Sequence, residues 1–370
     1  MLEFDIPEKE IERRKQVIRD VWEYKKVDHI PVMMSVDYNP WGYTMHDELY
    51  NREKQLKLRL NSVKNSLELI PDDYIPSMFI NIGCVAIASA LGAEIYYGEN
   101  EQQTPGVRKP IINKIEDIYK LKMPDPRKDG MIAEYIGRLK YFLEETEHKI
   151  AVSGLDMNGP VAVASDILGS ELLYTMMYEA QEDLIYLLNF TTDVIMKITD
   201  VSIEEAGGIE HFASTDFFWL WCPEGKKGHV SSDLCASYSP ELFRSLDIPV
   251  NNRIFRKYGG GLLHNCGPNP CVYEYLNHEP SISGVNLAYK YSCGDLAKFK
   301  KAFKGKGIIY FFYEENPQEA LAQYRETMEL LAPDVIAIPV VSVTDPAQDV
   351  ARLYEDFYNV SREYARRIWG

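Results

Sequence analysis

The stretch GLLHNCGPNPC, residues 261–271, brings a histidine and two cysteines close together in the chain. His264 and Cys266 are two residues apart and follow an apolar run that is typical of a strand. Because alternate residues of a strand point to the same side, both side chains can reach one ion. Cys271 lies beyond two prolines and is a poor third partner. From these residues alone the motif is a metal site, a redox pair or a structural loop.

Polar and aromatic side chains also follow the other apolar runs of the chain. Such a mixture suits a small, largely apolar organic substrate that carries a few polar groups. The residues expected to contact that substrate are Asn39, Trp41, Tyr43, Asn81, Asn158, Trp219, Asn286 and Tyr313. The candidate catalytic acids are Asp37, Asp156, Asp233 and Glu314. Each has a structural alternative, because an aspartate at a strand end often caps a helix and an aromatic ring there often packs under a loop.

The elements that must position these residues alternate between strands and amphipathic helices. Strands are expected at 29–38, 74–83, 261–267, 283–289, 307–314 and 334–341, with a strand that runs into a loop at 149–160 and a strand followed by an aromatic loop at 209–221. Helices are expected at 8–26, 51–70, 129–147, 163–178, 180–206, 239–259 and 316–331, the last beginning at an asparagine cap followed by proline. Repeated βα units require parallel strands. Eight of them predict an α/β fold of the (β/α)₈ TIM-barrel class, with functional residues at the carboxyl ends of the strands, His211 and Asp216 among them.

The whole chain, residues 1–370, is expected to form one barrel domain with an N-terminal helical segment (1–27) and a C-terminal helix (346–370). A net charge of −16 argues against nucleic acid as a partner. The charged N-terminus lacks the apolar region of a signal peptide, and no apolar run is long enough to cross a membrane. Six scattered cysteines predict a reducing, cytoplasmic location.

Several stretches resemble the uroporphyrinogen decarboxylase superfamily, which includes corrinoid-dependent methyltransferases. In chain order they are VDHIPVMM, GCVAIASALGAEI, KIEDIYKLKMPDPRKDG, GPVAVASDILGSELLYTMMYEAQEDLIYLLNFTTDVI, SSDLCASYSPELFR and GGLLHNCG. The resemblance covers most of residues 10–345 and implies a barrel of that superfamily. Its decarboxylases carry arginines in the first of these regions and an aspartate in the second. This chain has IPVMMSVDYNPWGY and Gly83 at those places, so the resemblance favours the methyltransferase branch.

In that branch the His-x-Cys pair supplies two zinc ligands, which carry over to His264 and Cys266. The family's third ligand is usually a cysteine just after the last strand, but residues 338–346 read IPVVSVTDP. Some relatives use an acid near the end of strand six, where this chain has Asn286. The substitutes that the chain offers are Cys222, Cys235, Asp233, Glu314, Cys293 and Asp345. The resemblance thus implies zinc, held by an incomplete set of the usual ligands.

The incomplete thiolate set and the aromatic pocket favour one reaction of that branch. We expect demethylation of a small methylated compound, such as a methoxylated aromatic, onto the cob(I)alamin of a partner corrinoid protein. Three alternatives stay open: a methylcorrinoid-to-thiol methyltransferase, a decarboxylase or lyase of a small acid, and a non-catalytic ligand-binding protein. The resemblance also implies a homodimer as one assembly state.

Overall fold

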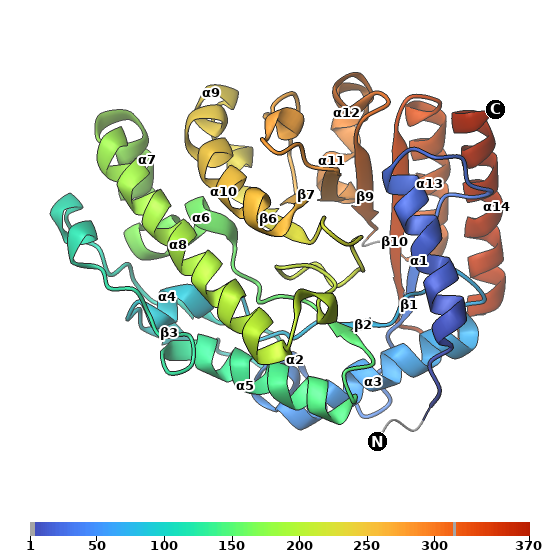
Figure 1. Ribbon diagram of the computed structural model, residues 1–370, viewed down its shortest axis with the longest axis horizontal. Helices are drawn as coiled ribbons and strands as arrows, with labels where there is room; N and C mark the ends of the chain where they lie inside the picture. Colours follow the sequence, from blue (N-terminus) through green and yellow to red (C-terminus); the bar gives the residue numbers. More distant parts are fainter. Residues whose placement is uncertain (1–3, 314–315) are drawn as a thin grey trace.

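A computed structural model describes residues 4–313 and 316–370, in which parallel strands curve into a barrel within a ring of helices (Figure 1). Six strands form most of the wall, in the order β1 (Met33–Val36), β10 (Ile336–Val343), β9 (Ile308–Phe312), β8 (Gly284–Ala288), β7 (Gly260–Asn265) and β6 (Gly228–Ser231). β2 (Ser77–Met78) pairs with β5 (Ala151–Val152), and a parallel bridge from Val152 to Phe212 continues the wall toward β6. The expected TIM-barrel class is confirmed.

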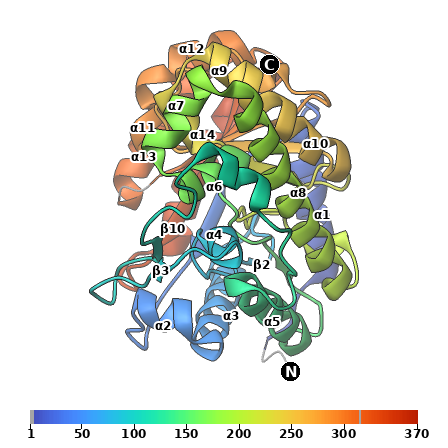
Figure 2. The ribbon, with the colours of Figure 1, turned by 90° about the vertical axis from the view of Figure 1, so that its left-hand side faces the viewer.

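Helices flank the strands, and those that lie between two wall strands return the chain from the carboxyl end of one to the amino end of the next. In chain order they are α1 (Glu8–Trp22), α2 (Met45–Tyr50), α3 (Arg52–Leu69), α4 (Ala86–Ala90), α5 (Gly130–Glu145), α6 (Gly159–Leu168), α7 (Ser170–Glu179), α8 (Gln181–Ala206), α9 (Pro240–Leu242), α10 (Ile248–Tyr258), α11 (Tyr289–Ser292), α12 (Leu296–Phe303), α13 (Pro317–Leu331) and α14 (Val350–Trp369). Figure 2 shows α3 and α5 at one end of the molecule, opposite α9 and α12. A short antiparallel pair, β3 (Ile95–Tyr96) and β4 (Gly106–Val107), lies apart from the barrel sheets.

Local sequence signals fix the start of α13 as expected. The side-chain oxygen of Asn316 accepts hydrogen bonds from the backbone N–H groups of Gln318 and Glu319, each at 3.1 Å. Pro317 occupies the first turn, where the helix has no backbone partner for an N–H group. The predicted asparagine cap is confirmed.

The first and last helices meet at the amino-terminal end of the barrel. Trp22 of α1 donates from Nε1 to the hydroxyl of Tyr310 in β9 at 2.9 Å, and the hydroxyl of Tyr24 donates to the carbonyl of Gly307 at 2.6 Å. Trp369 of α14 donates from Nε1 to the carbonyl of Tyr24 at 3.0 Å. Figure 1 shows α1 and α14 on the same side of the barrel. Among the described residues, no helix has the length and apolar composition needed to cross a membrane.

Residues 217–222 are the aromatic loop expected at the end of 209–221, and they run back into the barrel after a short wall segment at Phe212. Cys222 donates from its backbone N–H to the carbonyl of Ala213 at 3.0 Å, which folds the segment into a hairpin. Phe218 is fully buried and Trp221 is 5% exposed. This aromatic segment is apolar because it fills the barrel interior. A segment that is buried on all sides does not show the alternation of apolar and polar residues that marks a half-buried strand. We call residues 217–222 the interior hairpin.

Two details of this region differ from the expectation. Residues Ile209–His211 form a 3₁₀ turn before the wall segment, and the His211 ring lies against His148, so His211 is at the amino end of the barrel and not at its mouth. The strand that follows the interior hairpin, β6, was not predicted. Its four residues, GHVS, contain only one strongly apolar side chain, which leaves no pattern to detect.

Candidate active site

The carboxyl ends of β6 and β7 bring Asp233, His264 and Cys266 together. Ser231 of β6 stands opposite His264 of β7, and Asp233 and Cys266 each follow two residues later. Nε2 of His264 lies 3.3 Å from Sγ of Cys266 and 3.5 Å from Oδ2 of Asp233. The backbone N–H of Cys266 donates to Oδ1 of Asp233 at 2.6 Å. Strand register therefore places Asp233 beside the His-x-Cys pair.

The other residues considered as a third ligand lie elsewhere. Cys222 and Cys235 are buried at other places in the core, and Cys293 is exposed on a 3₁₀ turn after β8. Asp345 accepts a hydrogen bond from the backbone N–H two residues further on. Glu314, which was also a candidate catalytic acid, falls outside the described residues. Of the described substitutes, Asp233 is the one that joins the cluster.

The distances from Nε2 of His264 to the other two donor atoms are close to those around a tetrahedral zinc ion. With a Zn–N bond of about 2.05 Å, a Zn–S bond of about 2.3 Å and a Zn–O bond of about 2.1 Å, N and S lie about 3.6 Å apart and N and O about 3.4 Å apart. The corresponding distances here are 3.3 Å and 3.5 Å. Burial lowers the pKa of His264, although the nearby Asp233 carboxylate opposes this change. The neutral imidazole that results is the form that binds metals, so the donor set fits zinc.

Two further carboxyl groups surround this cluster. Asp156, which follows β5, has a pKa raised to about 8, first by burial and then by the neighbouring carboxylates Asp216 and Asp233. Oδ1 of Asp216 accepts from the backbone N–H of Met157 at 3.0 Å. Asp156 is therefore largely protonated at neutral pH and can donate a proton, whereas the surrounding negative charge attracts a cation.

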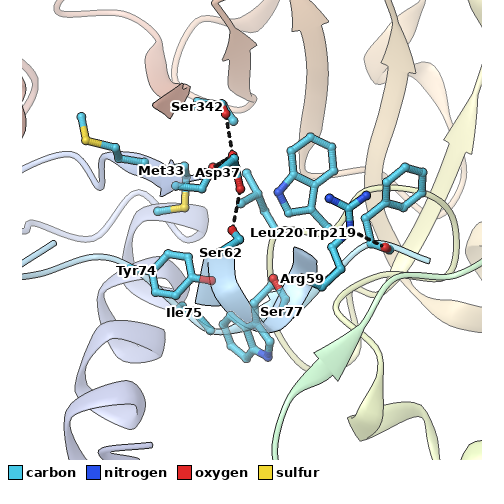
Figure 3. Close-up of a pocket in the computed structure, with 15 residues that line it drawn as sticks. Met33, Asp37, Arg59, Ser62, Tyr74, Ile75, Ser77, Trp219, Leu220 and Ser342 are labelled. Carbon is cyan, nitrogen blue, oxygen red and sulfur yellow. Dashed lines mark hydrogen bonds between the residues drawn. The ribbon is translucent and has the colours of Figure 1, made fainter. Parts of the chain in front are cut away.

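A cavity of about 310 Å³ lies between β1, the start of β2 and the interior hairpin (Figure 3). Its wall is mainly apolar and includes Met33, Tyr74, Phe79, Trp219 and Trp221. A second cavity of about 680 Å³ opens at the carboxyl ends of β9 and β10 and shares several wall residues, Trp219 among them, with the first. The volume of the first cavity lies at the lower end of the range typical of small-molecule sites.

The polar groups of the first cavity centre on Asp37 and Arg59. The Asp37 carboxylate accepts hydrogen bonds from the hydroxyls of Ser35, Ser62 and Ser342, at 2.6, 2.5 and 2.5 Å (Figure 3). Arg59 of α3 donates from Nε to the carbonyl of Phe79 at 3.0 Å and pairs with a glutamate of α2. Asp37 thus belongs to this cavity, apart from the cluster that contains Asp233.

The interior hairpin contacts both the cavity and the cluster. The Phe217 ring stands edge-on to His264, with ring centroids 5.0 Å apart. Trp219, two residues along, lines the cavity and contacts Phe312 of β9, with centroids 5.4 Å apart. The interior hairpin therefore borders both the cavity and the ring of His264.

The remaining residues expected to contact substrate are dispersed. Tyr313 lines the second cavity, and Asn39 and Tyr43 line a hollow of about 250 Å³ beside Asp37. Trp41 is 38% exposed and stacks on Tyr43.

Three asparagines in the same group have hydrogen-bonded positions inside the protein. Asn81 accepts from the backbone N–H of Gly83 at 3.0 Å, near α2 and α3. Asn158 adopts a left-handed conformation before α6 and donates to the carbonyl of Cys84 at 3.2 Å. Asn286 is fully buried between His264 and His229. These contacts show what each amide does within the folded chain.

Sequence reasoning missed His229 and Arg59. His229 lies on the unpredicted strand β6, and the signal that could have found it is its place four residues before Asp233 in GHVSSD. Arg59 lies inside a helix with a regular leucine pattern, where an arginine is expected to face solvent. Only the packing of α3 against β1 and β2 turns its guanidinium toward the cavity.

Comparison with known proteins places these observations in context. A sequence model of the family described as uroporphyrinogen decarboxylase (URO-D) matches residues 14–216, more than half of the chain. Among solved structures, the chain is similar to a methyltransferase from Methanosarcina mazei, with a TM-score of 0.68 and 17% sequence identity, covering 95% of this chain and 98% of that one. At this identity the likeness establishes a common fold. No curated protein sequence matches the chain.

Proposed function

The chain belongs to the uroporphyrinogen decarboxylase family, and from this premise we propose that it is a methyltransferase that demethylates a small methylated compound onto a corrinoid protein. The observation that carries the proposal is the cluster of Asp233, His264 and Cys266 at the carboxyl ends of β6 and β7. Functional groups of TIM-barrel enzymes lie at this end of the strands. The methyl acceptor would be the cob(I)alamin of the partner protein.

Two features argue against decarboxylation of a porphyrinogen. Gly83 occupies the position of the decarboxylase aspartate; its φ is +82°, and a Cβ atom there would lie 2.6 Å from the ring of Pro105. The cavity of about 310 Å³ contains one guanidinium, that of Arg59, among its lining residues. One cation in so small a space suits a substrate much smaller than a tetrapyrrole with many carboxylates. The fold shared with the Methanosarcina mazei methyltransferase agrees with the alternative.

Asp233, His264 and Cys266 are the residues that would hold zinc. Bound there, zinc would act as a Lewis acid toward the oxygen that leaves the methyl group. Because burial lowers the pKa of His264, its ring is neutral and can bind a metal ion. The carboxylate of Asp233 adds a negative charge that attracts a divalent cation.

We assign proton delivery to Asp156. In ether demethylation the methyl–oxygen bond breaks, the methyl group passes to the corrinoid as a cation equivalent, and the oxygen keeps the bonding pair and takes up one proton. Because the pKa of Asp156 is raised to about 8, mainly by burial, its carboxyl holds that proton at neutral pH. An acid whose pKa lies near the working pH is the most effective proton donor.

The first cavity supports a methoxylated aromatic as the substrate class. Tyr74, Phe79 and Trp219 provide ring surfaces for an aromatic ligand. Asp37 and Arg59 provide an acceptor and a donor for its polar substituents, and each is already fixed by hydrogen bonds to neighbouring groups.

The test is incubation of zinc-loaded protein with free cob(I)alamin and a panel of aromatic and aliphatic methyl ethers under anoxic conditions. We expect the absorption of cob(I)alamin to give way to that of methylcobalamin with an aromatic ether, and no change with the Cys266→Ser variant. The Cys293→Ser variant, which alters an exposed cysteine outside the cluster, is the matched control and should keep full activity.

Three other results would each replace the proposal. Methyl transfer only from methylcobalamin to an added thiol would assign the thiol methyltransferase activity. Release of carbon dioxide from a small acid would assign a decarboxylase. Tight ligand binding without turnover of any substrate would assign a binding protein.

A further inference from the structure

A continuous line of buried side chains leads from Asp216 to the cluster. Oδ2 of Asp216 lies 3.4 Å from Nδ1 of His229, and Nε2 of His229 lies 2.8 Å from Oδ1 of Asn286. Nδ2 of Asn286 lies 2.7 Å from Nδ1 of His264, whose Nε2 faces Cys266 and Asp233. Asp216, His229 and Asn286 are each no more than 2% exposed. We call these three residues the relay.

Strand register builds the relay across three strands. Ser231, two residues after His229 on β6, pairs with His264 on β7, and His264 pairs with Asn286 on β8. The Phe218 ring stacks on His229 with centroids 5.4 Å apart and an interplanar angle of 10°. The two rings and the amide between them are therefore held in place from several sides.

The Asn286 carboxamide can take two orientations with opposite consequences for His264, and only the second gives every contact of the line both a donor and an acceptor. With the amide NH₂ donating to Nδ1 of His264, the neutral ring carries its proton on Nε2, directed at Cys266 and Asp233. His229 then donates from Nε2 to the amide oxygen, and its Nδ1 lone pair faces the Asp216 carboxylate. In this orientation the Nε2 lone pair that a metal needs is absent.

A half-turn of the carboxamide reverses every donor and acceptor in the relay. The amide oxygen then accepts from Nδ1–H of His264, the NH₂ group donates to Nε2 of His229, and Nδ1–H of His229 donates to Asp216. Each contact has one donor and one acceptor, and the Nε2 lone pair of His264 faces Cys266 and Asp233. Metal-binding histidines commonly donate from their other nitrogen in this way.

We propose that Asn286 is a positioning residue whose carboxamide couples metal binding at His264 to the tautomer of His229. Without metal, Nε2–H of His264 satisfies the Cys266 sulfur and the Asp233 carboxylate. When metal binds, the His264 proton occupies Nδ1, Asn286 turns, and the His229 proton moves to Nδ1 beside Asp216. The inference rests on the proposed function for the identity of the metal site and adds how the protein prepares that site.

The experiment records ¹⁵N-detected histidine spectra of the full chain with and without zinc. In the wild type we expect both His264 and His229 to change tautomer when zinc is added. In Asn286→Ala the His229 signal should no longer respond to zinc, and the zinc affinity, measured by competition with a chelator, should fall by about 10- to 100-fold. In Asn286→Asp, which can only accept, His264 should carry Nδ1–H even without zinc and the affinity should stay within about threefold of the wild type.

The matched control is Asn252→Ala. Asn252 is a buried asparagine of α10 that accepts from the backbone N–H of Glu279, outside the relay, so zinc affinity should not change. A His229 tautomer that ignores zinc in the wild type would overturn the proposal, as would wild-type affinity in Asn286→Ala. Neither measurement uses a methyl donor, so a protein that shows the coupling but transfers no methyl group would refute only the proposed function.

Discussion

Among the described residues, two clusters bring histidine and carboxylate side chains within reach of one ion, and they lie at opposite ends of the barrel. His29, Asp72 and Asp73 lie before β1 and β2, at the amino end of the strands, whereas Asp233, His264 and Cys266 follow β6 and β7. In the first, Nε2 of His29 contacts Oδ1 of Asp73 at 2.8 Å.

The carboxylate of the amino-end cluster is saturated by the fold. Oδ2 of Asp73 accepts from the backbone N–H of Val32 and from the hydroxyl of Tyr354 in α14, each at 2.9 Å, and Asp72 pairs with Arg13. Asp73 adopts a φ of +68°, a conformation that aspartate tolerates better than most residues. This cluster fastens the last helix to the strands. Proximity of metal-binding groups is therefore weak evidence until their other partners and their end of the barrel are known.

The largest expected effect comes from removing a donor at the carboxyl end. In His264→Ala, methyl transfer should fall by about 1000-fold, equivalent to about 4 kcal/mol, because zinc no longer stabilises the leaving oxygen. Zinc content, measured by mass spectrometry of metals, should drop with it, while His29→Asn should keep its zinc. Zinc retained by His264→Ala and lost from His29→Asn would reverse the roles given to the two clusters.

Asp73→Ala should instead cost stability. Removal of one partner from a buried ion pair destabilises a protein by about 3–5 kcal/mol, so urea unfolding should shift by this amount while the folded fraction keeps its zinc. Tyr354→Phe, a milder change, removes one hydrogen bond to the carboxylate and should cost about 1.5–3 kcal/mol. If urea unfolding is unchanged in both variants, the contact of Asp73 with Tyr354 does not hold α14 to the strands.

The amino-end cluster also predicts a pH dependence of stability. Burial alone would lower the pKa of His29, but its hydrogen bond to Asp73 together with the negative charge of the nearby carboxylates raises it overall. The contribution of His29 is therefore fully present below pH of about 6.5 and is lost as the pH rises through the raised value. Asp73→Ala should abolish that part of the pH profile.

Replacement of Asp156 should lower the activity of the protein but raise the stability of its fold. Asp156→Asn removes the proton donor and should slow demethylation by about 100-fold. In the wild type the rate of demethylation should fall as the pH rises through about 8, where the carboxyl loses its proton.

Because its pKa is raised in the folded state, Asp156 destabilises the fold increasingly above pH of about 4 and fully above pH 8. Asp156→Asn should thus raise the melting temperature more at pH 8 than at pH 5. A variant that is both less active and less stable would contradict this assignment.

The smallest of these effects concerns the cavity wall. Trp219→Ala should raise KM for an aromatic ether by about tenfold, since loss of a ring contact costs roughly 1–1.5 kcal/mol, without loss of zinc. Trp41→Ala, which changes an exposed tryptophan outside the cavity, should alter KM by less than twofold. Equal effects in the two variants would argue that the cavity does not hold the substrate.

Features that depend on a few consecutive residues could be predicted from the sequence, whereas features that depend on contacts between distant parts of the chain could not. The cap at Asn316, the spacing of His264 and Cys266, and the repeated βα pattern are local, and each is present in the structure as expected. Strand β6 and the burial of the interior hairpin inside the barrel were missed because both depend on neighbours far along the chain. A short strand and an aromatic hairpin have no periodicity of their own.

By itself, the sequence determined the barrel class and one pair of donor residues, because both depend on spacing along a few consecutive residues. The tertiary structure alone decided the third member of the cluster. Asp233 meets Cys266 because Ser231 and His264 are paired in register, and Asn286 meets His264 for the same reason one strand further on. Register between parallel strands is set by packing of the whole barrel, so no local pattern could have chosen Asp233 from the candidate ligands or predicted the contact between Asn286 and His264.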